Sequence, residues 1–154
     1  MSSKTIVNDA AFLAKGFVVD TNKNRLDLAY VYRFLTEQSY WAKNLSYEKF
    51  TVSVANSTCF GLYQNGKQVG FARVISDFST FAYLADVFID ETCRKQSLGK
   101  WLLQCVLAHP DFKDLRRWLL ATADAHNFYR QFGFNNLNQP ERFMQIFKPY
   151  IAKG

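Results

Sequence analysis

The sequence predicts one domain of the mixed α/β class, and three patterns of apolar residues support this expectation. First, apolar side chains recur at intervals of three and four residues over 25–38, as in an amphipathic helix. Second, they alternate over 58–76 around an Asn-Gly pair that is typical of a β-hairpin. Third, strand, helix and strand patterns follow one another over 81–122, an order that requires a parallel crossover. Because 49% of the 154 residues are apolar, one sizeable core can form, so residues 1–154 are treated as a single domain.

The first part of the chain is expected to form a strand and two helices. Residues 16–21 are a short β-branched run that ends at the polar cluster 22–24, which predicts a strand followed by a turn. The helix over 25–38 comes next. Ser46 is a suitable N-cap for a second helix, which places both helices before the hairpin.

The second part of the chain is expected to form most of the sheet. Asn65-Gly66 supplies the positive φ angles of a tight hairpin turn, and the run Phe81–Ile89 adds a third antiparallel strand. The remaining expected elements are a buried helix over 98–109 that Pro110 ends, a buried strand over 117–122, a short helix over 124–131 closed by Gly133, and a last strand over 143–147.

The composition restricts the functional classes. A net charge of +6 favours anionic partners, but the basic residues are dispersed and form no continuous stripe for nucleic acid. The three cysteines lack CxxC spacing, which argues against a disulfide framework or a zinc site. Neither an export signal nor a membrane span is recognisable. We therefore expect a cytoplasmic protein with no metal, and neither a membrane nor nucleic acid as its partner.

Residues 94–100 are the most informative stretch. Basic residues and the short turn Ser97-Leu98-Gly99 lead from a predicted strand directly into the predicted helix over 98–109. The first amides of a helix have no intrahelical partner and the helix dipole adds partial positive charge, so this arrangement can bind a phosphate group. A solvated basic turn before a core helix explains the same residues, and local features do not separate the two interpretations.

Two motifs resemble signatures of the GCN5-related N-acetyltransferases. Residues 94–99 (RKQSLG) resemble the Q/R-x-x-G-x-G/A loop of this family, which lies between the fourth strand and the third helix. Residues 127–134 (NFYRQFGF) resemble its second signature, a helix carrying a tyrosine followed by a Gly-Phe pair. The order of elements over 16–147 is also similar.

The resemblance implies an α/β fold with a central mixed sheet of about six to seven strands flanked by about four helices. It also implies an enzyme that moves an acetyl group from acetyl-CoA to a primary amine of a small molecule or peptide, by direct attack in a ternary complex.

The resemblance further implies roles for particular residues. Tyr129 would be the general acid that protonates the departing CoA thiolate, although a packed core tyrosine explains it too. Backbone groups of residues 87–89 would pair with the pantetheine arm, and the amides of 95–100 would hold the pyrophosphate. Basic side chains of this loop would add charge, unless they are only solvated surface. The implied cofactor-binding set is Val87, Phe88, Ile89, Arg94, Lys95, Gln96, Ser97, Leu98, Gly99, Lys100 and Thr122.

Two positions depart from the family pattern. Ser97 stands at the first glycine of the loop, where serine costs about 1 kcal/mol or more if the backbone is left-handed but is favoured in the extended geometry of an N-cap. Because Ser97 immediately precedes the helical run, we expect the extended geometry. Thr122 stands where the family has an asparagine, and it offers one hydroxyl instead of an amide. Asp124 is expected to cap the helix over 124–131.

The general base and the acceptor site are less determined by the sequence. Asp86 and His126 are candidates for the base, and water is an alternative. Asp86 could equally be structural, as the partner of a buried turn or of an arginine, and His126 could be a packed helix residue. In the segment between the first two helices, Tyr40, Trp41 and Tyr47 could form an aromatic wall against the amine, or could simply pack in the loop.

Two other functions fit some of these features. A non-catalytic acyl-CoA-binding or sensing module would explain Ser97, Thr122 and the uncertain base, and a nucleic-acid-binding domain would use the positive charge. The expected partners remain acetyl-CoA and an amine acceptor, and a homodimer is compatible with the sequence.

Overall fold

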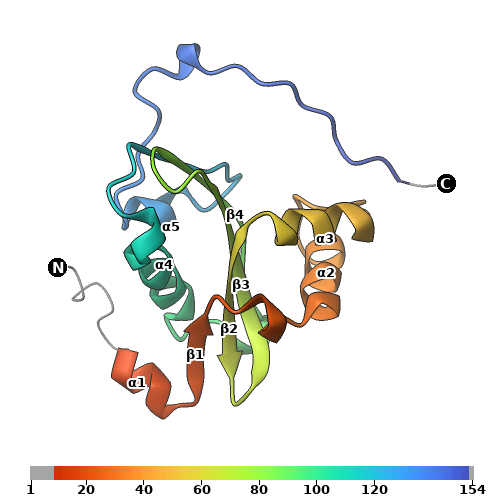
Figure 1. Cartoon of the computed structure of the whole chain (residues 1–154), viewed down its shortest axis with the longest axis vertical. Helices are drawn as coiled ribbons and strands as arrows, with labels where there is room; N and C mark the ends of the chain where they lie inside the picture. Colours follow the sequence, from red (N-terminus) through yellow and green to blue (C-terminus); the bar gives the residue numbers. More distant parts are fainter. Residues whose placement is uncertain (1–8, 153–154) are drawn as a thin grey trace.

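The computed structural model describes residues 9–152 and consists of a five-stranded sheet with helices on both faces (Figure 1). The strands, in their order across the sheet, are β1 (Phe17–Asp20), β2 (Thr58–Gln64), β3 (Lys67–Ser76), β4 (Phe81–Ile89) and β5 (Arg117–Leu119). The α-helices are α1 (Asp9–Ala14), α2 (Leu28–Glu37), α3 (Tyr47–Ala55), α4 (Leu98–Ala108) and α5 (His126–Arg130). Short 3-10 turns are η2 (Lys23–Arg25), η3 (Glu91–Cys93), η4 (Pro110–Phe112) and η5 (Pro140–Arg142).

The sheet is mixed, which confirms the predicted class. Neighbouring strands from β1 to β4 pair antiparallel, whereas β4 and β5 pair parallel. The predicted hairpin is also confirmed, since β2 and β3 are joined by Asn65 and Gly66 with φ angles of +50° and +87°. Two consecutive positive φ angles match the twist of the flanking strands, which is why an Asn-Gly pair suits this turn.

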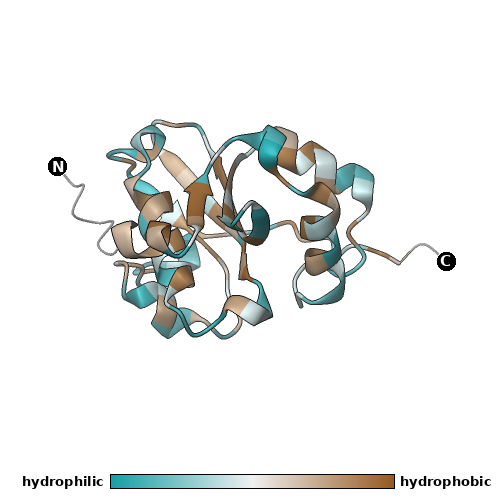
Figure 2. Cartoon of the chain, turned by 90° about the horizontal axis from the view of Figure 1, so that it is seen from below, coloured by the Kyte–Doolittle hydropathy of each residue, from teal (hydrophilic) through white to brown (hydrophobic). Residues whose placement is uncertain are grey.

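Helices cover both faces of the sheet and enclose two apolar layers. Figure 1 shows α2 and α3 on one side and α1, α4 and α5 on the other. On the first side the ring of Phe34 from α2 stacks on that of Phe88 from β4, with centroids 3.8 Å apart. On the second side Leu102 and Leu103 of α4 pack in a cluster with Ala72 of β3. Figure 2 shows the hydrophobic residues along the strands and on the helix faces that meet them. Burial of these faces is the main stabilising contribution to the fold.

Helix α1 was not expected from the sequence. Its Phe12 is buried and stacks on Trp101 of α4, with centroids 4.7 Å apart and planes at 16°. A helix of six residues has little stability of its own, so this contact with α4 holds it in place.

Several expected elements are shorter or absent. The helix expected over 124–131 forms only over His126–Arg130. The predicted first helix begins at Leu28 instead of Arg25, because η2 takes up the start of that segment. The strand expected over 117–122 ends at Leu119, where it parts from β4. Within residues 9–152, the expected strand over 143–147 does not form, so the sheet has five strands instead of six to seven. A strand needs a partner edge for its backbone groups, and residues 143–147 lie against none in this chain.

Phe34→Ala should lower the free energy of unfolding by about 3–5 kcal/mol, because it removes a buried ring from the stack with Phe88 and leaves a cavity. Urea unfolding followed by circular dichroism measures the change. Val52→Ala is the control, since Val52 is 57% exposed on α3 and should change the value by less than about 0.5 kcal/mol. Equal effects of the two variants would contradict this view of the core.

Candidate functional site

A groove opens where β4 and β5 part. The two strands pair at only three positions, from Phe81 with Arg117 to Tyr83 with Leu119. Strand β4 then continues to Ile89 with no strand beside it on that side among the described residues. The backbone groups of residues 84–89 that face away from β3 therefore have no strand partner among the described residues.

A β-bulge lies in the middle of the open part of β4. Arg73 pairs with Ala85 and Phe71 pairs with Phe88, so Asp86 and Val87 together oppose one residue of β3. Asp86 has a φ of +54°, a left-handed conformation that is uncommon for residues other than glycine. The extra residue of a bulge is left out of the ladder and bends its strand. The bulge therefore interrupts the regular ladder between β3 and β4 at Asp86 and Val87.

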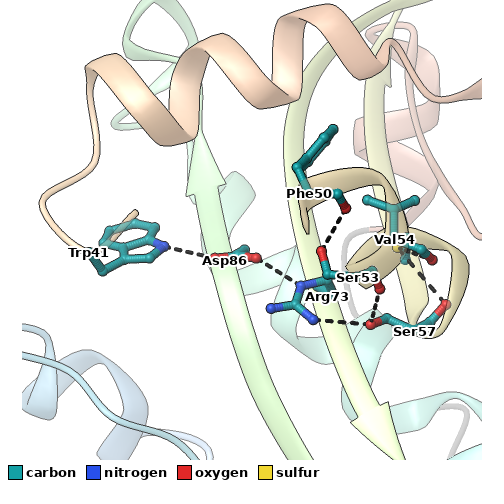
Figure 3. Close-up of polar contacts among 8 residues, drawn as sticks. Trp41, Phe50, Ser53, Val54, Ser57, Arg73 and Asp86 are labelled. Atoms are coloured by element: carbon teal, nitrogen blue, oxygen red, sulfur yellow. Dashed lines mark hydrogen bonds and ion pairs between the residues drawn. The ribbon is translucent and has the colours of Figure 1, made fainter. Parts of the chain in front are cut away.

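The side chain of Asp86 is held on both sides (Figure 3). Its Oδ2 accepts a hydrogen bond from Nε of Arg73 at 2.8 Å, and its Oδ1 accepts one from Nε1 of Trp41 at 2.8 Å. Arg73 in turn donates to Oγ of Ser57 at 3.1 Å. The ion pair is largely buried, so removal of one partner would leave an unpaired charge in the protein. Asp86 thus has a structural role that occupies both carboxylate oxygens.

An aromatic pair bridges the open end of the groove. Trp41 is bound to Asp86 of β4, and the hydroxyl of its neighbour Tyr40 accepts a hydrogen bond from the amide of Ala123 at 2.8 Å. The two rings meet edge to face, with centroids 5.1 Å apart. The loop between α2 and α3 is therefore attached to both sides of the gap, to β4 and to the segment after β5. Both rings are also exposed, so they can contact a ligand that enters from solvent.

A cavity of about 310 Å³ lies at the N-terminus of α4. Its lining includes six of the seven residues from 94 to 100, which the sequence had singled out, together with Ile89, Cys93, Phe128 and Gln131. Arg94, Lys95 and Lys100 are cationic, and the lining contains no acidic residue. The first turn of α4 also has no side-chain cap, so its amides remain available. Cations and free helix amides together make a site for an anion such as a phosphate.

Ser97 has the left-handed conformation, which corrects the expectation of an extended N-cap. Its φ is +63° and ψ is +20°, and its side chain makes no capping hydrogen bond. Lys95 has a φ of +67°, so two residues of this turn occupy a region that favours glycine. The path of the chain before α4 requires a left-handed conformation at position 97, and serine adopts this conformation at a cost in free energy.

Gly99 keeps one wall of the cavity open. A methyl group at this position would lie 3.6 Å from Cζ of Phe128 and 3.7 Å from Cγ1 of Ile89. Both side chains line the same cavity, so the methyl group would occupy space within it. A methyl group would therefore fit at ordinary van der Waals distances but would narrow the cavity, and the backbone of Gly99 is not in the left-handed region.

Tyr129 lies on α5 within a group of rings. Its ring meets those of Phe128 and Phe134 edge to face, at 5.1 and 5.9 Å. Gly133, with a φ of +98°, turns the chain so that Phe134 returns to Tyr129. Burial, with a smaller contribution from the nearby phenol of Tyr40, raises the pKa of Tyr129 to about 12. Tyr129 therefore remains protonated at neutral pH.

A second cavity, of about 550 Å³, extends from β5 past Tyr129. It also contains Thr122 and His126, so the structure brings three sequence-predicted residues to one cavity. The hydroxyl oxygen of Thr122 accepts a hydrogen bond from the amide of Ala125 at 3.1 Å, which supports the start of α5. Asp124 does not cap this helix as expected, because its N-cap is Ala125.

Seven sequence-predicted residues line neither cavity, and these are Tyr40, Trp41, Tyr47, Asp86, Val87, Phe88 and Gln96. Tyr47 packs edge to face on Tyr32 at 5.0 Å and lies near Phe50, so it belongs to the α2 and α3 layer. The Nε2 of Gln96 donates to the carbonyl of Cys93 at 3.3 Å and stabilises the turn. Sequence reasoning missed the cavity residues Cys93, Phe128 and Gln131, and it missed Arg73 as the partner of Asp86. The ion pair between Arg73 and Asp86 could have been predicted only from the presence of a basic and an acidic residue on two neighbouring strands.

Comparison with known proteins identifies the family. The model of the acetyltransferase (GNAT) domain matches residues 55–136, which include the groove, the cationic cavity and Tyr129. The chain belongs to the GCN5-related N-acetyltransferase family. A protein of Gibberella zeae named as an acetyltransferase is 31% identical over 124 residues, which are 68% of this chain and 70% of that protein. Acyl transfer is the activity that this membership supports.

Solved structures agree with this assignment. A crystal structure from Xanthomonas campestris pv. campestris, described as an acetyltransferase of the GNAT family, is 39% identical, with a TM-score of 0.86 over 90% of this chain and 97% of that one. N-acetylglutamate synthase from Neisseria gonorrhoeae, solved with coenzyme A and N-acetyl-glutamate, shares the fold at a TM-score of 0.64 and 15% identity, over 81% of this chain and 30% of that one.

Within residues 9–152, no group of His, Cys, Asp and Glu is arranged to hold a metal, and no helix is long and apolar enough to cross a membrane.

Ser97→Gly should raise the free energy of unfolding by about 1 kcal/mol, because glycine adopts the left-handed conformation without the cost that serine carries. Urea unfolding of the ligand-free protein measures the effect. The matched control is Ser46→Gly: Ser46 has extended geometry and accepts a hydrogen bond from the amide of Lys49, so this change should lower stability by a few tenths of a kcal/mol. A loss of stability in both variants would show that the side chain of Ser97 has a stabilising contact.

Proposed function

We propose that this protein is a cytoplasmic N-acetyltransferase that moves an acetyl group from acetyl-CoA to a primary amine of a small molecule or peptide. One observation carries the proposal: the cationic cavity at the N-terminus of α4 includes Ile89 at the end of the unpaired part of β4 and Phe128 of α5, the helix that also carries the protonated Tyr129. The cysteine pattern of the sequence supports the reducing compartment.

The cavity suits the phosphate end of acetyl-CoA. Arg94, Lys95 and Lys100 would neutralise the pyrophosphate, while the amides of residues 98–100 donate hydrogen bonds to it. Residues 87–89 would pair with the amides of the pantetheine arm, since the outer edge of β4 is open there. A protein that shares the fold, N-acetylglutamate synthase, was solved with coenzyme A bound, which supports coenzyme A as the class of ligand.

The reaction needs one new bond, one broken bond and one proton donor. The amine nitrogen attacks the thioester carbonyl, a C–N bond forms, and the C–S bond breaks. The hydroxyl of Tyr129 donates its proton to the leaving sulfur, and the proton that the amine loses restores the tyrosine through water. Unpaired backbone at the bulge of β4 lies in the same groove and can donate to the carbonyl oxygen as negative charge develops.

The acceptor amine would enter past Tyr40 and Trp41. Their exposed rings attract a cationic amine by cation–π interaction or an uncharged one by apolar contact. Asp86 does not act as the base in this proposal, because Arg73 and Trp41 occupy its oxygens. His126 is exposed in the cavity that contains Tyr129, so it or water can take the proton of the amine.

Acetyl-CoA should stabilise the protein against heat, and Lys100→Gln should weaken its binding by about tenfold, or about 1.4 kcal/mol, because one cation is lost from the pyrophosphate site. Isothermal titration calorimetry measures both affinities. Lys113→Gln makes the same change of charge on an exposed residue outside the cavity and should bind as the wild type does. Absence of binding by any CoA ester would end the proposal.

Tyr129→Phe should lower kcat by about 100-fold or more while the Kd of acetyl-CoA changes little, because only the transferable proton is removed. Release of free thiol over a panel of amines measures turnover. With an acceptor that is already deprotonated, kcat of the wild type should not fall between about pH 8.5 and 10.5. A tyrosine with the ordinary pKa of about 10 would lose its proton in that range, whereas one raised to about 12 keeps it.

Tyr83→Phe is the control for this variant, since Tyr83 lies on β4 but lines neither cavity. Wild-type turnover in Tyr129→Phe would remove the role of Tyr129. Normal binding of acetyl-CoA without thiol release for any amine would identify a non-catalytic acyl-CoA-binding module instead.

A further inference from the structure

The aromatic pair, Tyr40 and Trp41, lies on the opposite face of the sheet from the cationic cavity. Trp41 is bound to Asp86, which is bound to Arg73 of β3. Arg73 follows Ala72, which packs in the cluster with α4, and successive side chains of a strand point to opposite faces. The pair is therefore on the side of α2 and α3, whereas α4 and α5 cover the other side (Figure 1). A ligand that enters the groove from the side of α4 and α5 meets the two rings across the gap.

The loop that carries the aromatic pair is anchored to the layer of α2 and α3. The hydroxyl of Ser39 donates to the carbonyl of Leu35 at 2.6 Å and accepts from the amide of Ala42 at 3.2 Å, so it attaches the start of the loop to α2. Ala42 and Leu45 are buried in the apolar cluster of this layer. A segment with buried side chains and paired backbone opens only at a cost in free energy. The two rings are therefore held over the gap.

Tyr40 lies close to the residue that would act on the leaving sulfur. Its phenol contributes to the raised pKa of Tyr129, after the larger effect of burial. Its hydroxyl accepts a hydrogen bond from the amide of Ala123, which directly follows Thr122 of the cavity that contains Tyr129. In the proposed reaction Tyr129 protonates the sulfur of the donor. The acyl group on that sulfur would then lie between Tyr129 and the ring of Tyr40.

We infer that Tyr40 limits the length of the acyl group that this protein transfers. The inference rests on the proposed function and names a residue that decides which donors are accepted. An acetyl group ends one carbon beyond its carbonyl, whereas each further methylene of a longer acyl chain would extend toward the ring of Tyr40. Because the loop is anchored, a longer chain would have to break the hydrogen bond from Ala123 to Tyr40 or fold back within the groove. Acetyl-CoA and other short acyl esters are therefore the donors that fit.

The test compares acetyl-CoA with hexanoyl-CoA on the full chain and on variants of single tyrosines. Tyr40→Ala removes the ring and frees the amide of Ala123, which is exposed and can bind water instead. Tyr47→Ala is the matched control, since Tyr47 is also an exposed tyrosine but packs on Tyr32 in the layer of α2 and α3. Calorimetry measures the Kd of each ester, and release of free thiol measures kcat/KM. The same amine is used with both donors, so that an effect on amine binding cancels in their ratio.

The wild type and Tyr47→Ala should prefer acetyl-CoA over hexanoyl-CoA by at least about 100-fold in kcat/KM, and the preference should be at least about tenfold smaller in Tyr40→Ala. The ratio of the two Kd values should change in the same direction. Tyr40→Leu keeps more apolar surface and should show a smaller change of the same sign, which tests the inference even if Tyr40→Ala is unstable.

A wild type that uses both donors equally overturns the inference. Variants of Tyr40 that keep the preference of the wild type also overturn it, including variants that lose both activities to the same extent. Binding of neither ester would end the proposed function as well. Equal binding and equal transfer of both esters would leave the proposed function intact and end only this inference.

Discussion

The parting of β4 and β5 after three paired residues is the constraint on which the rest of the site depends. A sheet that continued to pair would have no opening for a ligand, and a sheet that ended there would have no backbone to offer one. Here β4 continues for six further residues with one edge free, and the bulge at Asp86 and Val87 bends it within that stretch. The cost of the unpaired backbone is offset by the rings and aliphatic side chains that pack on both faces of β4, among them Phe88.

The polar residues near the gap have different roles from those that their chemistry alone suggests. An acidic residue on the strand beside a groove is a natural candidate for a base, yet Asp86 forms a buried pair with Arg73 and holds Trp41. The pair also fixes the left-handed bulge, because the side chain of Asp86 is bound to a neighbouring strand. Rigidity at this point keeps the unpaired backbone of the bulge in one orientation, which is the requirement for stabilising charge in a transition state.

Features of the fold that follow from local signals could be predicted from the sequence. The Asn65-Gly66 turn, the helix that begins at Leu98 and the antiparallel meander depend on neighbouring residues, and the structure has them where they were expected. The order of strand, basic turn and helix indicated residues 94–100 as a candidate anion site, and the structure has a cavity lined by cationic residues there. The backbone of these residues could not be predicted, because the left-handed angle at Ser97 is imposed by the path of the chain and not by the serine.

The missed features depend on partners distant in the sequence. Arg73 and Asp86 meet only because β3 and β4 are adjacent, and helix α1 depends on the ring of Trp101 far along the chain. The segment 143–147 has the pattern of a strand, but it pairs with no strand among the described residues. A pattern shows what a segment can form, whereas the availability of a partner decides whether it does.

The loop with Tyr40 and Trp41 also limits the dimensions of the groove. The loop is hydrogen-bonded to β4 through Asp86 and to the chain after β5 through Ala123. It therefore restricts the distance between two strands that are not paired with each other at this point. The width of the groove at this end then depends on two hydrogen bonds and a ring contact instead of on hydrogen bonds between the strands. Selectivity for the size of the acyl group would therefore depend on a surface loop, which can change in length or sequence without disturbing the packed core.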